Sequence, residues 1–279
     1  MKRLLPLTAF AALLLSSCQN SETTDETSTT DTVTAQAAAQ PIELTDVSPS
    51  PDFSGAQLTI GNVTAAAPQG DSVKLTFNFN VKNYELKSQT ADAGGKLCNN
   101  SAQGQHIHFI MDNQPYVALY EPKHETTVQK NSEHHLLVFL SRSYHESLKS
   151  KGAAAVYHFK VDSAGKLQKL DAPTTPMVFY SRPKGDYLGR DVENVLLDFY
   201  VMNTTLSQGG HNVKVHVTGN GVDTTFTITE WKSKFLRKLP MGKQSITLTL
   251  VDKDGNRVEG PQTEVTREFN LSQDEPMAK

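Results

Sequence analysis

The sequence predicts an all-β protein built from two antiparallel β-sandwich domains. Three observations support this prediction: apolar and polar residues alternate in many short segments, turn-forming residues separate those segments, and one pattern occurs twice along the chain. Alternation with a period of two is typical of a strand that buries one face. Many short strands with such spacing indicate sandwiches, because the apolar face of one sheet must be covered by another.

The predicted strands extend from residue 73 to residue 250 and are separated by turn residues. Asp112-Asn113 and Gly219-Asn220-Gly221 are examples, since Gly and Asn tolerate the backbone angles of tight turns. Helical periodicity is scarce, and only residues 144–151 and 232–237 suggest a short helical turn. The segments that alternate are Val73–Val81, Ile107–Met111, Leu136–Leu140, Ala155–Val161, Val195–Val201, Val213–Val217, Thr225–Thr229 and Ile246–Leu250.

An internal repeat places a domain boundary near residue 173. Each copy contains a strand, an Asn-x-x-Leu segment, a Gly-x-His entry to a second strand, and a return strand. Asn83 and His106 represent the first copy, and Asn203 and His211 represent the second. Three prolines between the copies suggest a linker. The expected domains are a His-rich sandwich at 51–172 and a second sandwich at 173–279.

The N-terminus predicts an export signal followed by a tether. Lys2 and Arg3 precede an apolar run that is too short to span a bilayer, which needs about 20 residues. The run ends in Leu15-Ser16-Ser17-Cys18, which resembles the lipobox of bacterial lipoproteins. This resemblance implies removal of the signal peptide, residues 1–17, and lipidation of Cys18. Residues 18–50, rich in Ser and Thr at their start, are expected to form a disordered tether.

The whole chain resembles Bacteroidota outer-membrane lipoproteins with immunoglobulin-like β-sandwich domains. The lipobox, the repeat over roughly 70–270 and the Gly-x-His-x-His element at 104–108 carry this resemblance. It implies two immunoglobulin-like domains on a lipid anchor (palmitate or a related acyl chain) in the outer membrane, on either the periplasmic or the surface side. A fold of this kind does not by itself define an activity.

Composition excludes some functions. Loss of Lys2 and Arg3 leaves 25 of the 27 basic residues against 30 acidic ones, a formal charge of −5. Nucleic-acid binding is therefore not expected, because it requires a positive surface. Since lipid occupies Cys18, Cys98 has no partner for a disulfide and is expected to be a buried apolar residue, with a free thiol or a metal ligand as alternatives.

Seven of the nine histidines lie between residues 106 and 158. His106 and His108 would project from the same face of a strand, about 7 Å apart. If the strand at 134–140 pairs with theirs, His134 or His135 supplies a third ligand for Cu or Zn, and Asp112 or His145 a fourth. The alternative is that these imidazoles are exposed and bind no metal. The second copy of the repeat lacks the cluster, so any such site belongs to the first domain.

A second candidate site follows an apolar strand at residues 141–147. Arg142 can contact a carboxylate or phosphate, and His145 and Glu146 can exchange protons. Tyr144 and the preceding Tyr116 would add aromatic surface to a ligand site. The alternative is a capped turn with a buried tyrosine.

No motif for nucleophilic or metalloprotease catalysis occurs in the chain. The sequence therefore favours a non-enzymatic envelope lipoprotein whose first domain binds an envelope protein, a glycan or a small ligand. The alternatives are a Cu- or Zn-binding lipoprotein and a purely structural envelope component.

Overall fold

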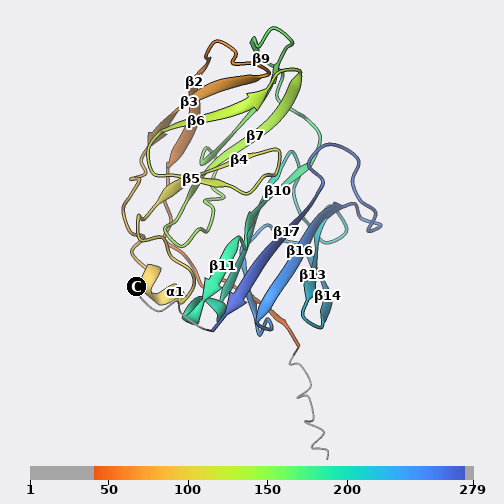
Figure 1. Ribbon diagram of the computed structural model, residues 1–279. Coiled ribbons are helices and arrows are strands. Elements are labelled where there is room, and N and C mark those ends of the chain that lie inside the picture. Colours follow the sequence, from red (N-terminus) through yellow and green to blue (C-terminus); the bar gives the residue numbers. More distant parts are fainter. Residues whose placement is uncertain (1–40, 274–279) are drawn as a thin grey trace, which may run out of the picture. The chain divides into compact units, whose positions relative to one another are not determined.

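The first sandwich packs a three-stranded sheet against a five-stranded one. The computed structural model describes residues 41–273, so the predicted signal and Cys18 lie outside the described residues. The smaller sheet has the order β2-β3-β6, and the larger has β5-β4-β7-β8-β9 (Figure 1). The strands are β2 (Gln57–Ala65), β3 (Ser72–Lys82), β4 (His106–Met111), β5 (Val117–Leu119), β6 (Lys123–Gln129), β7 (Ser132–Ser141), β8 (Ala154–Val161) and β9 (Leu167–Lys169).

The second sandwich repeats this plan. One sheet has the order β1-β15-β12-β10, and the other has β11-β17-β16-β13-β14. The strands are β1 (Glu43–Asp46), β10 (Met177–Arg182), β11 (Gly185–Leu188), β12 (Val195–Met202), β13 (Asn212–Gly219), β14 (Val222–Ile228), β15 (Lys234–Arg237), β16 (Gly242–Val251) and β17 (Glu264–Ser272). The two helical segments of the described chain are α1 (Ala93–Lys96) and the 3-10 turn η1 (Gly189–Val192).

Strand pairing makes the two sandwiches equivalent. β3 lies between β2 and β6 as β12 lies between β10 and β15, and β4 and β7 pair as β13 and β16 do. The all-β fold of two immunoglobulin-like sandwiches is therefore confirmed. The register corrects one detail of the repeat. His106 lies opposite Ser141, and Asn212 lies opposite the equivalent Val251, so His106 corresponds to Asn212 rather than to His211.

Alternation along the strands builds the two cores. In β3, Val73, Leu75, Phe77 and Phe79 are buried, and the residues between them are less so. In β4, Ile107 and Phe109 face the same core. The second core forms in the same way from β12, β13 and β16. Each buried Phe or Leu side chain stabilises the fold by about 1.5–3 kcal/mol through loss of apolar surface from water.

The outer face of the larger first sheet packs against the second sandwich. Ile110, Leu137 and Phe139 form one cluster with Phe179 and Tyr200 of β10 and β12. Both faces of β4 and β7 are therefore buried, which explains their nearly continuous apolar character.

The turn residue Asn113 strengthens this interface. Its amide donates to Val178 O at 2.9 Å and to Gln262 Oε1 at 2.9 Å, and its side-chain oxygen accepts from Tyr180 N at 2.9 Å. An apolar contact supported by satisfied buried hydrogen bonds holds the sandwiches together.

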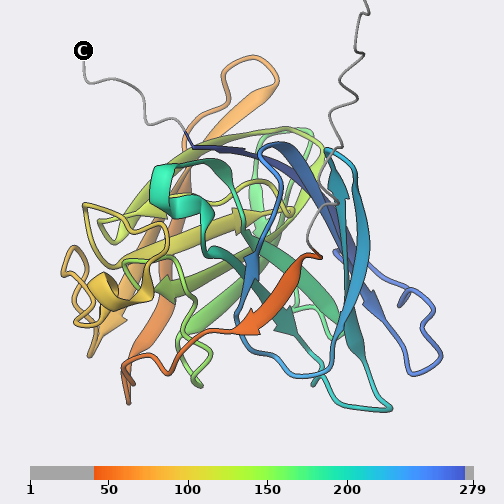
Figure 2. The ribbon, with the colours of Figure 1, turned by 90° about the horizontal axis from the view of Figure 1, so that it is seen from below.

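Several local predictions are wrong. The tether was expected to extend to residue 50. Glu43–Asp46 instead forms β1, which pairs with β15 in a sheet of the second sandwich (Figure 2). Residues 234–237 form a strand rather than a helical turn, because Phe235 and Leu236 are buried between neighbouring strands. Residues 144–151 form turns and bends rather than helix. Within residues 41–273, no helix is long and apolar enough to cross a membrane.

Candidate metal centre

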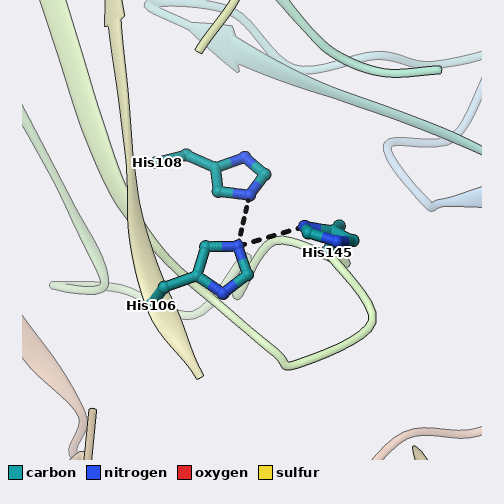
Figure 3. Close-up of side chains that lie close together, drawn as sticks. All are labelled: His106, His108 and His145. Carbon is teal, nitrogen blue, oxygen red and sulfur yellow. Dashed lines mark hydrogen bonds between the residues drawn. The ribbon is translucent and has the colours of Figure 1, made fainter. Parts of the chain in front are cut away.

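Three histidine side chains converge between the two sandwiches. His106 Nε2 lies 2.9 Å from His108 Nε2 and 3.1 Å from His145 Nδ1 (Figure 3). One nitrogen from each ring lies within 4.8 Å of the other two. His106 and His108 are fully buried, and His145 is 6% exposed. The arrangement places three nitrogen lone-pair positions around one point.

The alternation of β4 directs two of these rings away from the first core. Ile107 and Phe109 point into the sandwich, so His106 and His108 project from the opposite face, toward the second sandwich. On an isolated sheet this face would be exposed. Here β10 covers it, and Ser181 Oγ lies 3.1 Å from His108 Nδ1.

His145 reaches the site from the hairpin after β7, in an unusual backbone conformation. Its φ is 68°, a left-handed value that is uncommon outside Gly, Asn and Asp. The equivalent hairpin of the second sandwich has the same backbone hydrogen bonds and carries Gly255, with φ 81°. A histidine therefore occupies a position whose geometry suits glycine, and strain of this kind is common at functional sites.

Hydrogen bonds fix the orientation of the rings. His106 Nδ1 donates to the carbonyl of Gly104 at 2.7 Å, which leaves the lone pair of Nε2 directed at the other two rings. Metal-binding histidines typically donate their second nitrogen to a backbone carbonyl in this way. The Ser181 hydroxyl has the corresponding place beside His108 Nδ1.

Burial keeps the three imidazoles uncharged. It lowers the pKa of His106 to about 4, and it holds the pKa values of His108 and His145 well below the usual value of a histidine. The positive charges of Arg182 and Lys184 act in the same direction. Neutral imidazole is the form that coordinates metal ions.

Aromatic rings and two cations surround the cluster. The ring of Tyr116 stacks on His108 with centroids 3.7 Å apart, and its hydroxyl lies 3.2 Å from His145 Nδ1. Lys184 Nζ lies 4.2 Å and Arg182 Cζ 5.4 Å from the centroid of the Tyr116 ring. An aromatic ring therefore covers one side of the cluster, and two positive charges lie against that ring.

The second sandwich acts as an internal control. The positions equivalent to His106, His108 and His145 carry Asn212, Lys214 and Gly255. Lys214 Nζ donates to Gly255 O at 2.8 Å and occupies the space where three rings meet in the first sandwich. The cluster is thus a property of the first sandwich, as the sequence predicted.

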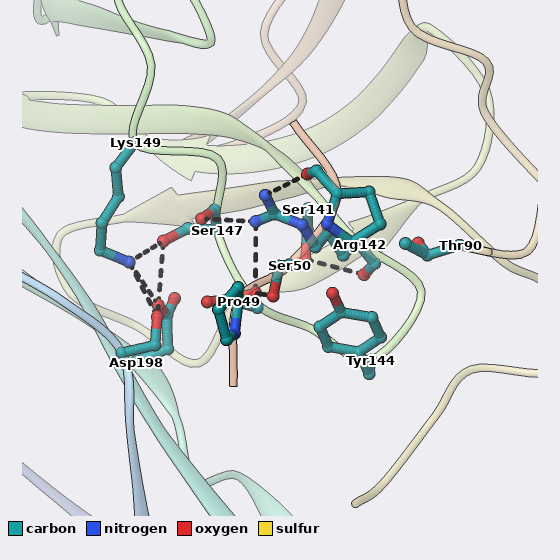
Figure 4. Close-up of polar contacts among 12 residues, drawn as sticks. Pro49, Ser50, Thr90, Ser141, Arg142, Tyr144, Ser147, Lys149 and Asp198 are labelled. Carbon is teal, nitrogen blue, oxygen red and sulfur yellow. Dashed lines mark hydrogen bonds and ion pairs between the residues drawn. The ribbon is translucent and has the colours of Figure 1, made fainter. Parts of the chain in front are cut away.

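Part of the ligand site predicted at residues 141–147 has a structural role instead. Arg142, which Figure 4 shows near Ser50, pairs with Glu146 at 3.3 Å and donates to Pro51 O at 2.7 Å. Ser50 donates to Glu146 at 2.5 Å, and Tyr144 is 1% exposed. Arg142 and Glu146 hold residues 50 and 51 against the hairpin, and the hydroxyl of the buried Tyr144 bonds to Asp92, so all three side chains are engaged within the protein. His145 and Tyr116 are the two members that join the histidine cluster.

His134 and His135 lie away from the cluster. β4 and β7 do pair, and in their antiparallel register Met111 lies opposite Leu136 while His106 lies opposite Ser141. This register puts His134 and His135 at the far end of the sheet. His134 Nδ1 lies 2.6 Å from Asp112 Oδ2 instead.

Another group of potential ligands forms at that far end. Glu133, His135 and His158 have ligand atoms within 4.8 Å of one another. Both nitrogens of His158 are already engaged, with Asp171 O and Glu133 Oε1, each at 2.8 Å. Glu133 is largely exposed to water. This group therefore forms a surface hydrogen-bond network and offers fewer free lone pairs than the buried cluster.

The remaining cysteine is not part of either group. Cys98 is buried in an apolar cluster with Tyr144, Leu196 and Phe235. Burial raises the pKa of its thiol to about 12, which leaves it protonated at neutral pH. This environment agrees with the prediction of a buried apolar residue.

Sequence reasoning missed Ser181, Arg182 and Lys184, which complete the wall of the cluster. They belong to the second sandwich, and nothing in their local pattern links them to residues 106–145. The polar run that follows the apolar segment at 177–180 was the available signal, and its proline suggested a linker instead.

The fold and this buried three-histidine cluster define an all-β chain of two immunoglobulin- or fibronectin III-like sandwiches with a potential metal centre between them. No family model and no curated protein matches the sequence.

Solved structures show similarity of fold. The fibronectin(III)-like modules of CbhA from Clostridium thermocellum match at 12% identity and a TM-score of 0.26, over 76% of this chain and 95% of that one. The central fibronectin-III array of RIM-binding protein matches at 12% identity and a TM-score of 0.25, over 81% and 71%. The two tandem V-type regions of VCBP3, a chitin-binding protein, match at 8% identity and a TM-score of 0.23, over 77% and 100%. These similarities concern the fold and not the function.

Proposed function

We propose that this chain is an exported, lipid-anchored protein that binds a Cu or Zn ion through His106, His108 and His145. The observation that carries the proposal is the convergence of three buried, neutral imidazole nitrogens, two of them 2.9 and 3.1 Å from His106 Nε2. Burying three polar rings costs free energy unless each nitrogen has a partner. A bound ion satisfies all three lone pairs at once.

The distances suit such an ion. Imidazole nitrogens bind Zn²⁺ at about 2.0–2.1 Å, so two nitrogens that subtend about 90–110° at the ion lie about 2.9–3.4 Å apart. The two separations within the cluster fall in this range. Hydrogen bonds alone satisfy the cluster less well. Two ring nitrogens approach His106 Nε2, whose single lone pair accepts only one N–H at full strength.

The ligand chemistry favours Cu and Zn over harder ions. Imidazole is a common ligand of Cu and Zn, whereas Mg²⁺ and Ca²⁺ require several oxygen ligands. Cu²⁺ is expected to bind more tightly than Zn²⁺ in a site of this type. Three protein ligands leave one coordination position open. We propose a role in holding or transferring the ion, without a catalysed reaction.

The location forms part of the same proposal. The segment Leu15-Ser16-Ser17-Cys18 supports export and lipidation at Cys18, and the resemblance to Bacteroidota lipoproteins supports the outer membrane. The cell envelope lacks the reduced thiol pools of the cytoplasm, which bind Cu and Zn ions. A site made of imidazoles alone therefore fits this compartment.

The test is a Cu²⁺ and Zn²⁺ titration of the mature chain carrying Cys18→Ser, which removes the lipid. A His106→Ala/His108→Ala double variant and a His145→Ala variant are compared with His216→Ala, a histidine of the second sandwich outside the cluster. We expect one ion per chain, lost in both cluster variants and kept in the control. Equal binding by all four proteins would contradict the proposal, as would no binding to any of them.

A further inference from the structure

Arg182 is a buried cation without a carboxylate partner. Its side chain is 6% exposed, and its electrostatic neighbours include the hydroxyls of Tyr187 and Tyr116. Among residues 41–273, no ion pair joins it to Asp or Glu. A buried charge is costly unless an opposite charge or several hydrogen bonds compensate it.

Lys184 adds a second positive charge beside it. Its ammonium donates to the backbone oxygen of Tyr116 at 2.8 Å and lies against the Tyr116 ring. Within the described chain, it also forms no ion pair with a carboxylate. Two cations therefore face the same tyrosine with no anion between them.

Unused hydrogen-bond donors accompany these charges. Arg182 Nε is buried and has no partner. The hydroxyl oxygen of Tyr187 accepts bonds from Arg182 Nη1 and from the backbone N–H of Lys184, each at 3.2 Å. No residue of the described part of the chain accepts the hydrogen of that hydroxyl. An acceptor with negative charge would satisfy Arg182 Nε.

These groups adjoin the three-histidine cluster. Tyr116 connects them, because its ring stacks on His108 and its hydroxyl contacts His145 while Arg182 and Lys184 lie over the ring. Ser181, the residue before Arg182, is hydrogen-bonded to His108. A divalent ion at the cluster would add two further charges to a region where, among residues 41–273, two cations form no ion pair with a carboxylate. Such a site needs a counter-charge.

We propose that Arg182 and Lys184 hold a small exchangeable oxyanion, such as a carboxylate, that fills the open coordination position of the ion at His106, His108 and His145. The planar guanidinium matches the two oxygens of a carboxylate, and the lysine contributes a point charge. The inference rests on the proposed metal site for the coordination step. The anion site itself depends on Arg182 and Lys184 and not on the ion.

The experiment uses the mature chain with Cys18→Ser, loaded with one equivalent of Cu²⁺ and titrated with azide. Azide bound to Cu²⁺ gives a charge-transfer absorption band, and acetate should compete for the same position. Arg182→Met and Lys184→Met are compared with wild type and with Lys166→Met, which removes an exposed lysine of the first sandwich. We expect each of the first two changes to weaken azide binding about tenfold, the effect of losing one charge-assisted contact. Lys166→Met should bind azide as wild type does.

A metal-free arm separates this inference from the proposed function. In the presence of a chelator, acetate should raise the Tm of wild type and of Lys166→Met, and should leave the Tm of Arg182→Met unchanged. Arg182→Met should fold, because it removes a costly buried charge that no carboxylate compensates and loses only the bonds from Arg182 Nη1 to Lys184 O and Tyr187 Oη. If Cu²⁺ fails to bind but this acetate effect is seen, the anion site is supported and the metal proposal is contradicted. Azide affinity and acetate response that are equal in all four proteins would overturn the inference.

Discussion

Replacing His145 separates its backbone strain from its side-chain chemistry. A left-handed conformation costs a non-glycine residue about 1–2 kcal/mol. His145 adopts this conformation with φ 68°, at the position where the second sandwich has Gly255. His145→Ala removes the imidazole and keeps the strain, whereas His145→Gly removes both. Glycine loses more entropy on folding than alanine does, which offsets part of the relief.

We therefore expect His145→Gly to be more stable than His145→Ala by about 1 kcal/mol in the metal-free protein. For a chain of this size, that difference corresponds to about 2–4 °C in Tm. The assay is thermal unfolding followed by circular dichroism in the presence of a chelator. In a parallel titration, both variants should bind Cu²⁺ at least about 100-fold more weakly than wild type, since losing a direct ligand should cost more than losing a residue that only orients one.

Gly255→Ala provides the matched control in the second sandwich. A Cβ at Gly255 would meet Lys214 Nζ at 3.3 Å, the flexible end of a side chain, so the cost arises mainly from the backbone. This variant should lose about 1 kcal/mol of stability and keep its Cu²⁺ affinity. The reasoning is refuted if the Ala and Gly variants at position 145 melt at the same temperature, or if either one binds Cu²⁺ as wild type does.

Three further predictions concern acid stability, the interface and the core. Burial lowers the pKa of His106 to about 4, so below about pH 6.5 the unfolded chain binds more protons than the folded one. The free energy of unfolding of the metal-free protein should therefore fall between pH 6.5 and 4, by about 3 kcal/mol from this residue. Urea unfolding at pH 7.5 and 5 should show a smaller loss of stability for His106→Gln than for wild type. Asp198 accepts from Ser147 and Lys149 across the interface and from Ser233 within its own sandwich. Asp198→Ala should therefore cost about 3 kcal/mol in chemical denaturation, and a loss below 1 kcal/mol would contradict this. Phe77→Ala should cost about 3–5 kcal/mol in the same assay, because its fully buried ring packs against four other rings of the first sandwich. An unchanged midpoint of unfolding would contradict this.

Alternation predicted the strands whose two faces meet different surroundings. β3 and β13 alternate clearly because one face is buried in a core and the other is less so. β15 and β11 were missed, since each has four residues and a period of two cannot be recognised in so short a segment. β1 was missed for the same reason, since it also has four residues. The sequence therefore predicts clearly alternating strands such as β3 and β13 well. It misses the short strands and also β2, β6 and β10, which have nine, seven and six residues.

The histidine site was predicted in part because only part of it is local. His106 and His108 share a face through strand geometry alone, and this follows directly from their spacing. The third ring depends on the antiparallel register of β4 and β7, which brings the end of β7 and the following hairpin to His106. Choosing His145 over His134 and His135 required that register. Arg182 and Ser181 depend on the packing of two sandwiches, which no pattern within residues 106–145 can reveal.

The position of β1 has a consequence for how the protein is made. Glu43 pairs with Arg237, so the first strand of the described chain completes its sheet only when a late segment is present. The first sandwich has its own core and can fold earlier, before β1 has a strand to pair with. Contacts so distant along the chain form slowly. If the chain is exported as proposed, the second sandwich closes last, and the wall of Ser181, Arg182 and Lys184 reaches the three histidines only after nearly all of the protein has crossed the membrane.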